Sequence, residues 1–206
     1  IFEVETALAV LFFKDNSCDF SIFEAGLGGD MDATNVFSHP LMAVFTSIGM
    51  DHRQFLGDDI KEIAGHKCGI IKENEMVVSS YQDEACAEVI SCACQKKDIV
   101  PAFLLKEDIE IYSYMPLSFR YKKTYSMNPM VLGDYQIDNA SLSALCALKL
   151  REKGFALTSL AITEGINTAY IKGRMEMVAE SPLIFLDGAH NIPGALALRR
   201  TLNNSF

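Results

Sequence analysis

The sequence has no tryptophan, no initiating methionine and no long uncharged apolar run. A membrane-spanning helix needs roughly 20 apolar residues, whereas the longest uncharged apolar runs, 6–13 and 40–50, are much shorter. The sequence also lacks the basic segment followed by an apolar one that is typical of a secretory signal peptide. These absences argue against helical membrane spans and secretion, and we expect a cytoplasmic protein.

Basic residues are outnumbered by acidic ones, 18 Lys and Arg against 27 Asp and Glu, which gives a net charge of −9. Binding to a nucleic-acid backbone depends on many Lys and Arg contacts to phosphates. The charge therefore argues against nucleic acid and against an anionic membrane as main partners. We expect a monomer whose partners are small molecules.

The six cysteines form no C-x-x-C pair and have no neighbouring histidine. We interpret them as small, mostly buried residues in a reducing compartment. A zinc site is the alternative, but the spacing does not suit it. A G-x-x-x-x-G-K-[ST] phosphate loop is also absent, and residues 196–206 end in a helical pattern. We expect the chain to be a piece of a longer protein, truncated at both ends.

Half of the residues are apolar, and short apolar runs alternate with helical patterns along the first half of the chain. The expected strands are 19–24, 41–48, 76–79 and 99–103, and the expected helices are 2–13, 60–71 and 83–95. This alternation predicts an α/β fold with a mostly parallel sheet flanked by helices.

The pattern changes after residue 109. Residues 109–114 and 117–121 alternate like antiparallel strands, which predicts a β-insertion. Helices are expected at 139–153 and 157–166, strands at 175–178 and 183–186, and a last helix from residue 192. We predict a first domain over 1–171 and the start of a second α/β domain over 172–206.

Polar side chains follow three of the expected strands: Glu24, then Asp51 with His52, then Asp187 with His190. Ligands bind at the carboxyl ends of strands in open α/β sheets, so these residues predict a polar site. The alternatives are a solvated strand end for Glu24 and a loop histidine for His52.

Two basic residues extend this prediction. Lys67 falls on the apolar face of its helix, where it is either a lysine that reaches back to solvent or a reactive one. Arg174 is either a phosphate contact or part of a salt bridge near the predicted domain boundary.

Taken together, these motifs resemble the folylpolyglutamate synthase and dihydrofolate synthase family within the Mur ligases. The resemblance covers nearly the whole chain and rests on segments in the family's order: FEVET (2–6), EAGLGGDMDATNV (24–36), TSIGMDH (46–52), LG (56–57), IAGHKCGIIK (63–72), YQIDNA (135–140), KGRMEM (172–177) and LDGAHNIPG (186–194). The resemblance implies a central ATP-binding domain, here incomplete, and the beginning of a glutamate-ligase domain.

The resemblance implies an ATP- and Mg²⁺-dependent ligase that adds L-glutamate to tetrahydrofolate or to dihydropteroate through an acyl phosphate. The implied catalytic and metal-binding residues are Glu24, His52 and Lys67, the last as a carbamate. The implied nucleotide contacts are Asn139, Arg174, Asp187 and His190. The implied pterin-pocket residues are Phe2 and Asp32.

Three residues depart from the family pattern. Asp30 stands where an arginine is usual, His66 where an acid is usual, and Tyr135 where a histidine is usual. Two alternatives stay open: a non-catalytic nucleotide- or folate-binding paralogue, and another Mur-type ligase acting on a cell-wall precursor. Because the phosphate loop is missing, we expect no turnover from this chain alone.

Overall fold

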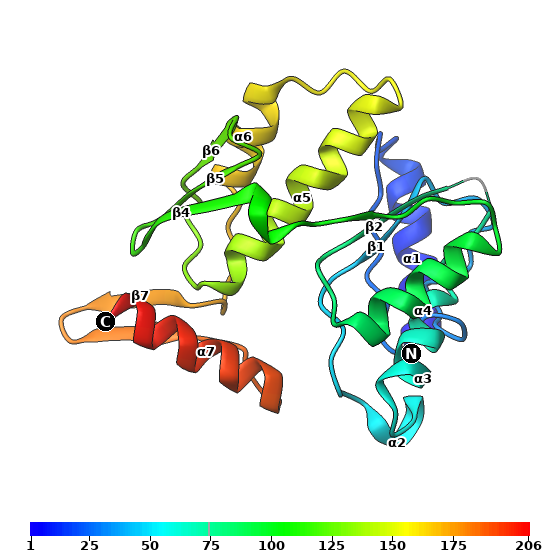
Figure 1. Ribbon diagram of the computed structural model, residues 1–206, viewed down its shortest axis with the longest axis horizontal. Helices are drawn as coiled ribbons and strands as arrows, with labels where there is room; N and C mark the ends of the chain where they lie inside the picture. Colours follow the sequence, from blue (N-terminus) through cyan, green and yellow to red (C-terminus); the bar gives the residue numbers. More distant parts are fainter. Residues whose placement is uncertain (74) are drawn as a thin grey trace. The chain divides into compact units, whose positions relative to one another are not determined.

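The computed structural model describes residues 1–73 and 75–206 (Figure 1). The chain forms two compact units. Unit 1 contains 1–43, 50–77 and 82–101, and unit 2 contains 44–49, 78–81 and 102–206. None of the helices in the described ranges has the length and apolar character needed to cross a membrane.

The predicted parallel sheet is present, with strands in the order β1 (Met42–Phe45), β2 (Met76–Ser79) and β3 (Ala102–Phe103). Strands β2 and β3 are parallel, with Val78 opposite Ala102. The amides of Met76 and Ser80 donate to the carbonyls of Leu41 and Phe45, at 3.3 and 2.8 Å. Donors and acceptors advance by the same step, so β1 and β2 also run in one direction.

Unit 1 contains the helices α1 (Phe2–Asp15), α2 (Arg53–Leu56), α3 (Ile60–Cys68) and α4 (Glu84–Gln95). Helix α3 begins where the Asp59 side chain accepts a hydrogen bond from the Lys61 amide at 3.0 Å, a typical N-cap. Helices α3 and α4 pack together through buried Ile63, Ala64 and Ile90. Three cysteines are also buried, at positions 68, 86 and 94, and all six are free thiols.

The predicted strand 19–24 is wrong. These residues form no strand, and the apolar run serves aromatic packing instead. The ring of Phe23 lies 5.5 Å from that of Phe13 and 4.9 Å from that of Phe37, whereas Ile22 is 90% exposed. A strand needs a neighbouring strand to satisfy its backbone, which an apolar run alone does not guarantee.

The predicted β-insertion is present in unit 2 as an antiparallel sheet of β4 (Ile109–Tyr114), β5 (Leu117–Tyr121) and β6 (Tyr125–Met127), which follows the short 3₁₀ helix η1 (Lys106–Asp108) (Figure 1). Burial alternates along β5, as expected when one face of a sheet is covered. Helices α5 (Tyr135–Glu152) and α6 (Ser159–Asn167) follow. Helix α5 begins four residues before the predicted start, so Asn139 lies inside the helix.

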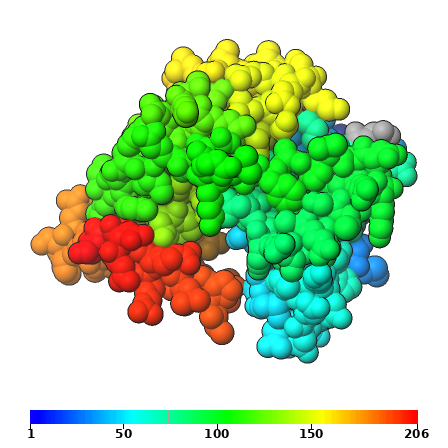
Figure 2. Space-filling view, in the orientation of Figure 1, coloured from blue at the N-terminus to red at the C-terminus, as the bar shows by residue number. Residues whose placement is uncertain are grey.

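The C-terminal part of unit 2 is an antiparallel hairpin, β7 (Glu176–Glu180) and β8 (Leu183–Leu186), followed by α7 (Ile192–Ser205). Helix α7 contacts β4, and Figure 2 shows this segment in orange to red beside the green strands. Thr201, which is 1% exposed, donates to Asp134 Oδ1 at 2.8 Å and accepts from the Asp134 amide at 3.1 Å. Residues 172–206 thus lie within unit 2, and the domain boundary at residue 172 stays a prediction.

Candidate functional site

Three segments of unit 1 meet at Gly28 and Gly29. A Cβ atom on Gly28 would lie 3.0 Å from the side chain of Leu56 in α2. A Cβ atom on Gly29 would lie 2.7 Å from the carbonyl oxygen of Lys67 in α3. Only glycine permits such close approach of backbone to backbone. The loop after Glu24, the end of the short helix α2 and the end of α3 are therefore held together.

Each of these segments carries one residue of the predicted metal set. Glu24 and His52 are exposed, and Lys67 is half-buried. Within residues 1–73 and 75–206, none of the three side chains has a hydrogen bond or an ion pair, so all three are available to a ligand. Whether they bind one ion together stays a prediction.

Glu24, His52 and Lys67 can bind a metal ion together only if each side chain supplies a suitable ligand atom. No group of three or more His, Cys, Asp or Glu that could hold a metal ion occurs in the described ranges. Magnesium prefers oxygen ligands, and Glu24 and His52 supply one carboxylate and one imidazole. The residues fit a divalent ion if Lys67 contributes carbamate oxygens, because an unmodified ammonium group cannot be a ligand.

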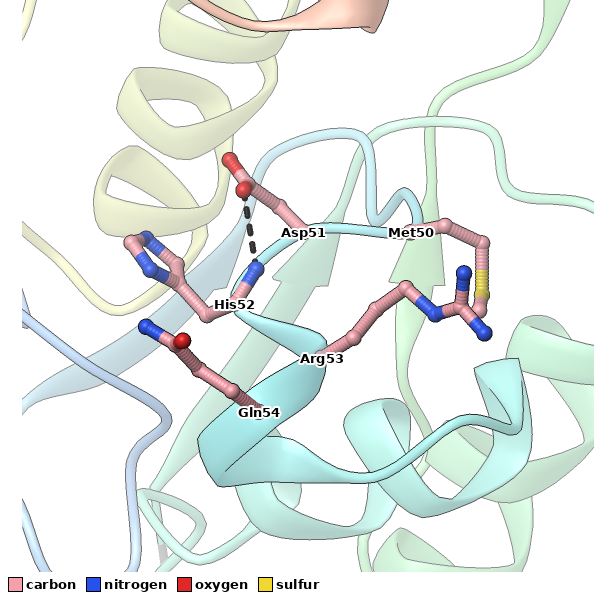
Figure 3. Close-up of a pocket in the computed structure, with 5 residues that line it drawn as sticks. All are labelled: Met50, Asp51, His52, Arg53 and Gln54. Carbon is pink, nitrogen blue, oxygen red and sulfur yellow. Dashed lines mark hydrogen bonds between the residues drawn. The ribbon is translucent and has the colours of Figure 1, made fainter.

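His52 lies in a shallow hollow of about 430 Å³ that is lined by the loop after β1 and the first turn of α2: Met50, Asp51, His52, Arg53 and Gln54 (Figure 3). Its backbone is left-handed, with φ of 53°, and its amide donates to Asp51 Oδ1 at 2.8 Å. Figure 3 shows the His52 and Gln54 side chains on one side and Arg53 on the other. The left-handed turn thus separates the imidazole from the Arg53 guanidinium.

Phe2 and Asp32, the predicted pterin-pocket residues, both lie beside Gly26. A Cβ atom on Gly26 would lie 3.0 Å from the Phe2 ring and 3.5 Å from Asp32 Oδ2. Asp32 accepts hydrogen bonds from the Leu27 amide at 2.8 Å and from the Thr34 hydroxyl at 2.6 Å. Partial burial opposes ionisation, but these hydrogen bonds lower the pKa of Asp32 overall. Asp32 therefore organises its own loop as an anion.

The departures Asp30 and His66 are in contact. His66 Nδ1 lies 2.8 Å from Asp30 Oδ2, and the Asp30 amide donates to the His66 carbonyl at 3.0 Å. The hydrogen bond from His66 lowers the pKa of Asp30. Where the family pattern has an arginine and an acid, this chain has an acid and a histidine, so the carboxylate stands at the other position of the pair. The glycine-rich loop stays tied to the turn that carries Lys67.

In unit 2, Asp187 accepts three hydrogen bonds of 2.9 Å. The donors are the Tyr135 hydroxyl and the Met175 amide to Oδ2, and the Ala189 amide to Oδ1. The predicted last helix is present as α7, which begins at Ile192 as expected and has Asn191 as its N-cap, so Asp187 lies in the turn before the helix. Asp187 joins α5, β7 and the turn after β8.

Arg174 lies just before β7, and His190 lies in the turn after β8. The Arg174 Nη1 atom is 3.4 Å from where a Cβ atom of Gly188 would lie, and no carboxylate in the described ranges pairs with it. His190 Nδ1 lies 2.9 Å from the Gly188 carbonyl. Because a carbonyl only accepts, Nδ1 carries the proton and Nε2 is free. The exposed Arg174 guanidinium can therefore bind an anion, and the exposed His190 leaves Nε2 without a protein partner in the described ranges.

Asn139 is exposed on α5, where its Nδ2 donates to Gln136 Oε1 at 3.1 Å. Beside it, the half-buried Asp138 accepts a hydrogen bond from the Tyr81 hydroxyl. Burial raises the pKa of Asp138, although the Tyr81 hydrogen bond opposes this. Sequence reasoning gave Asp138 and Tyr81 no role, because their contact joins residues 57 apart.

Comparisons with known proteins agree with this description. Residues 2–147 match the family model described as the Mur ligase middle domain. The dihydrofolate synthase/folylpolyglutamate synthase of Bacillus subtilis is 38% identical over 215 residues, covering 100% of this chain and 50% of the relative. The chain spans about half the length of the curated relatives it matches.

Two solved structures show the same fold. The folylpolyglutamate synthase of Mycobacterium tuberculosis complexed with ADP has a TM-score of 0.85 and 32% identity, covering 100% of this chain and 48% of that one. An FPGS–AMPPCP–folate complex has a TM-score of 0.86 and 28% identity, covering 96% and 50%.

Proposed function

The chain belongs to the Mur ligase family, in the branch of the folylpolyglutamate and dihydrofolate synthases, and from this we propose that it acts in ATP-dependent amide ligation. The proposed reaction joins L-glutamate to tetrahydrofolate, with dihydropteroate as a second acceptor. ATP phosphorylates the acceptor carboxylate, and the glutamate amine then displaces phosphate from the acyl phosphate. We further propose a cytoplasmic monomer.

The observation that supports this proposal most is the meeting of three segments at Gly28 and Gly29. These segments carry Glu24, His52 and Lys67, whose side chains are free in the described structure. Phosphoryl transfer depends on positioning and charge neutralisation more than on covalent help from the protein. Free ligand side chains on a rigid frame suit that requirement.

Each set of residues has a proposed role. Glu24, His52 and carbamylated Lys67 would hold Mg²⁺, which supplies Lewis acidity to the phosphates when bound. Arg174 and His190 would contact the phosphates, and Asn139 the adenine. Asp187 would contact the ribose while it holds its turn in place. Phe2 and Asp32 would face the pterin.

The first test is ADP release by the gene product that contains this chain, with glutamate and either tetrahydrofolate or dihydropteroate. Turnover with tetrahydrofolate alone indicates a monofunctional synthase, and turnover with both a bifunctional one. Absence of turnover with either acceptor contradicts the ligase proposal and leaves the non-catalytic binder.

Lys67→Ala tests the metal set. We expect ADP release to fall roughly 100-fold or more, the scale of losing one preorganised charge-stabilising group. Lys61→Ala is the matched control, because Lys61 lies on the same helix but pairs with Glu88 at 2.7 Å on the surface. Equal rates for the two variants would contradict the carbamate role of Lys67.

A further inference from the structure

The two segments that carry Arg174 and His190, before β7 and after β8, are joined by Asp187, which is held by a tyrosine without an assigned role. Asp187 accepts hydrogen bonds from the Tyr135 hydroxyl and from two backbone amides, each at 2.9 Å. A carboxylate has about four acceptor positions, so most of its capacity is used within the protein. Asp187 is chiefly an anchor, and Tyr135 is the only side chain in the described ranges that donates to it.

The ring of Tyr135 is itself held in place. Gly133 has φ of 109°, and a Cβ atom on it would lie 2.7 Å from Tyr135 Cε1. A side chain at position 133 would displace the ring, so the glycine permits the ring to fold back over the loop. Burial, together with the hydrogen bond to Asp187, raises the pKa of Tyr135. The hydroxyl therefore remains a donor at neutral pH.

The anchor controls the two free basic side chains. Arg174 immediately precedes Met175, whose amide is bound by Asp187. His190 immediately follows Ala189, whose amide is bound by the other carboxylate oxygen. The guanidinium of Arg174 also lies beside Gly188, which belongs to the turn that carries His190. A shift of the Asp187 carboxylate would therefore change the spacing between Arg174 and His190.

Resting on the nucleotide role proposed above, we infer that Tyr135 is a positioning residue for the nucleotide. Its hydroxyl holds Asp187, and through Asp187 it sets the spacing at which Arg174 and His190 meet the phosphates. Tyr135 itself need not touch the nucleotide.

Tyr135→Phe removes the hydroxyl and keeps the ring. We expect the KM for ATP to rise roughly tenfold, equivalent to about 1.4 kcal/mol, while the KM for glutamate stays unchanged. Tyr170→Phe is the control, because the Tyr170 hydroxyl donates to Glu176 at 2.6 Å nearby without touching Asp187. Because Tyr135 acts through Asp187, Tyr135→Phe should cost little more in an Asp187→Asn background.

A second measurement needs no nucleotide. In the free protein, Tyr135→Phe should speed amide hydrogen exchange at Met175 and Ala189, whereas Tyr170→Phe should leave both unchanged. A wild-type protein that binds no AMPPCP overturns the proposed function. If the wild type binds AMPPCP and Tyr135→Phe binds it with the same affinity, only the role of Tyr135 is overturned. The same holds if Tyr135→Phe leaves the exchange of the Met175 and Ala189 amides unchanged. A Tyr135→Phe variant that yields less folded protein but keeps the wild-type KM for ATP also overturns this role, because the contact would then be purely structural.

Discussion

At the scale of single residues, Glu75 is an unusual carboxylate. It is 7% exposed, its Oε1 accepts from the Lys72 amide, and its Oε2 is buried without a hydrogen bond in the described structure. Burial raises its pKa from 4.5 to about 7, against the opposing effect of the Lys72 amide and the charges of Lys72 and Lys97. The folded state therefore favours the protonated form.

The raised pKa fixes the sign of a pH effect. Stabilisation from protonated Glu75 is complete below about pH 4.5 and is lost as the pH rises through about 7. Glu75→Gln keeps the acceptor for Lys72 and cannot ionise. We expect this variant to exceed the wild type in unfolding free energy at pH 8 by roughly 1–3 kcal/mol, and much less at pH 5.

Urea unfolding at the two pH values measures this difference. Glu73→Gln is the control, because Glu73 lies two residues away and is exposed. This variant should change the unfolding free energy little at either pH. A Glu75→Gln effect that is the same at pH 5 and pH 8 would show that Glu75 does not titrate in this way.

At the scale of elements, sequence patterns predicted what depends on local sequence. The buried run of β2 was located exactly at 76–79, and α4 to within one residue. Contacts between distant residues had no such signal. The Tyr135–Asp187 hydrogen bond joins residues 52 apart, and the Asp30–His66 pair joins residues 36 apart. The motifs thus named the candidate residues, whereas their supporting contacts required the fold.

The end of α3 offers a test of the contact with the glycine-rich loop. A Cβ atom on Gly69 would lie 2.4 Å from the Asp30 Cα and 2.6 Å from its amide nitrogen. The φ of Gly69 is −59°, so alanine is acceptable to the backbone and only the space is lacking. We expect Gly69→Ala to lower the unfolding free energy by about 1–3 kcal/mol, as overpacking does, and to weaken Mg²⁺ binding.

Gly65→Ala is the matched substitution within the same helix. A Cβ atom there meets nothing within 4 Å, so alanine should stabilise the helix by about 0.5–1 kcal/mol. Thermal melts of both variants measure the contrast. Two variants of equal stability would mean that the loop does not pack against α3 as described.

At the scale of the whole molecule, apolar side chains are exposed along one face of α1. The sequence predicted a helix here, and its apolar residues Leu8, Leu11 and Phe12 are 60, 53 and 62% exposed. Nothing in the described structure covers them. Charge repulsion from a net charge of −9 opposes association at neutral pH, and this repulsion disappears near the pI of about 4.9.

We therefore expect a monomer at pH 8 that associates as the pH approaches 5, measured by light scattering. Leu8→Glu should reduce association at pH 5.5, because it places a charge on the apolar face. Gln95→Glu adds the same charge at an exposed position of α4 and should reduce association less than Leu8→Glu does. Equal effects of both variants would point to net charge alone as the cause.

The close backbone contacts of Gly29 with Lys67 and of Gly69 with Asp30 limit which mutations these two positions tolerate. Every single-base missense change in a glycine codon introduces a side chain with a Cβ atom. At these two positions that atom has no room. Point mutations at these two positions should therefore be selected against, and a gene library randomised there should become enriched in glycine after selection for folded protein.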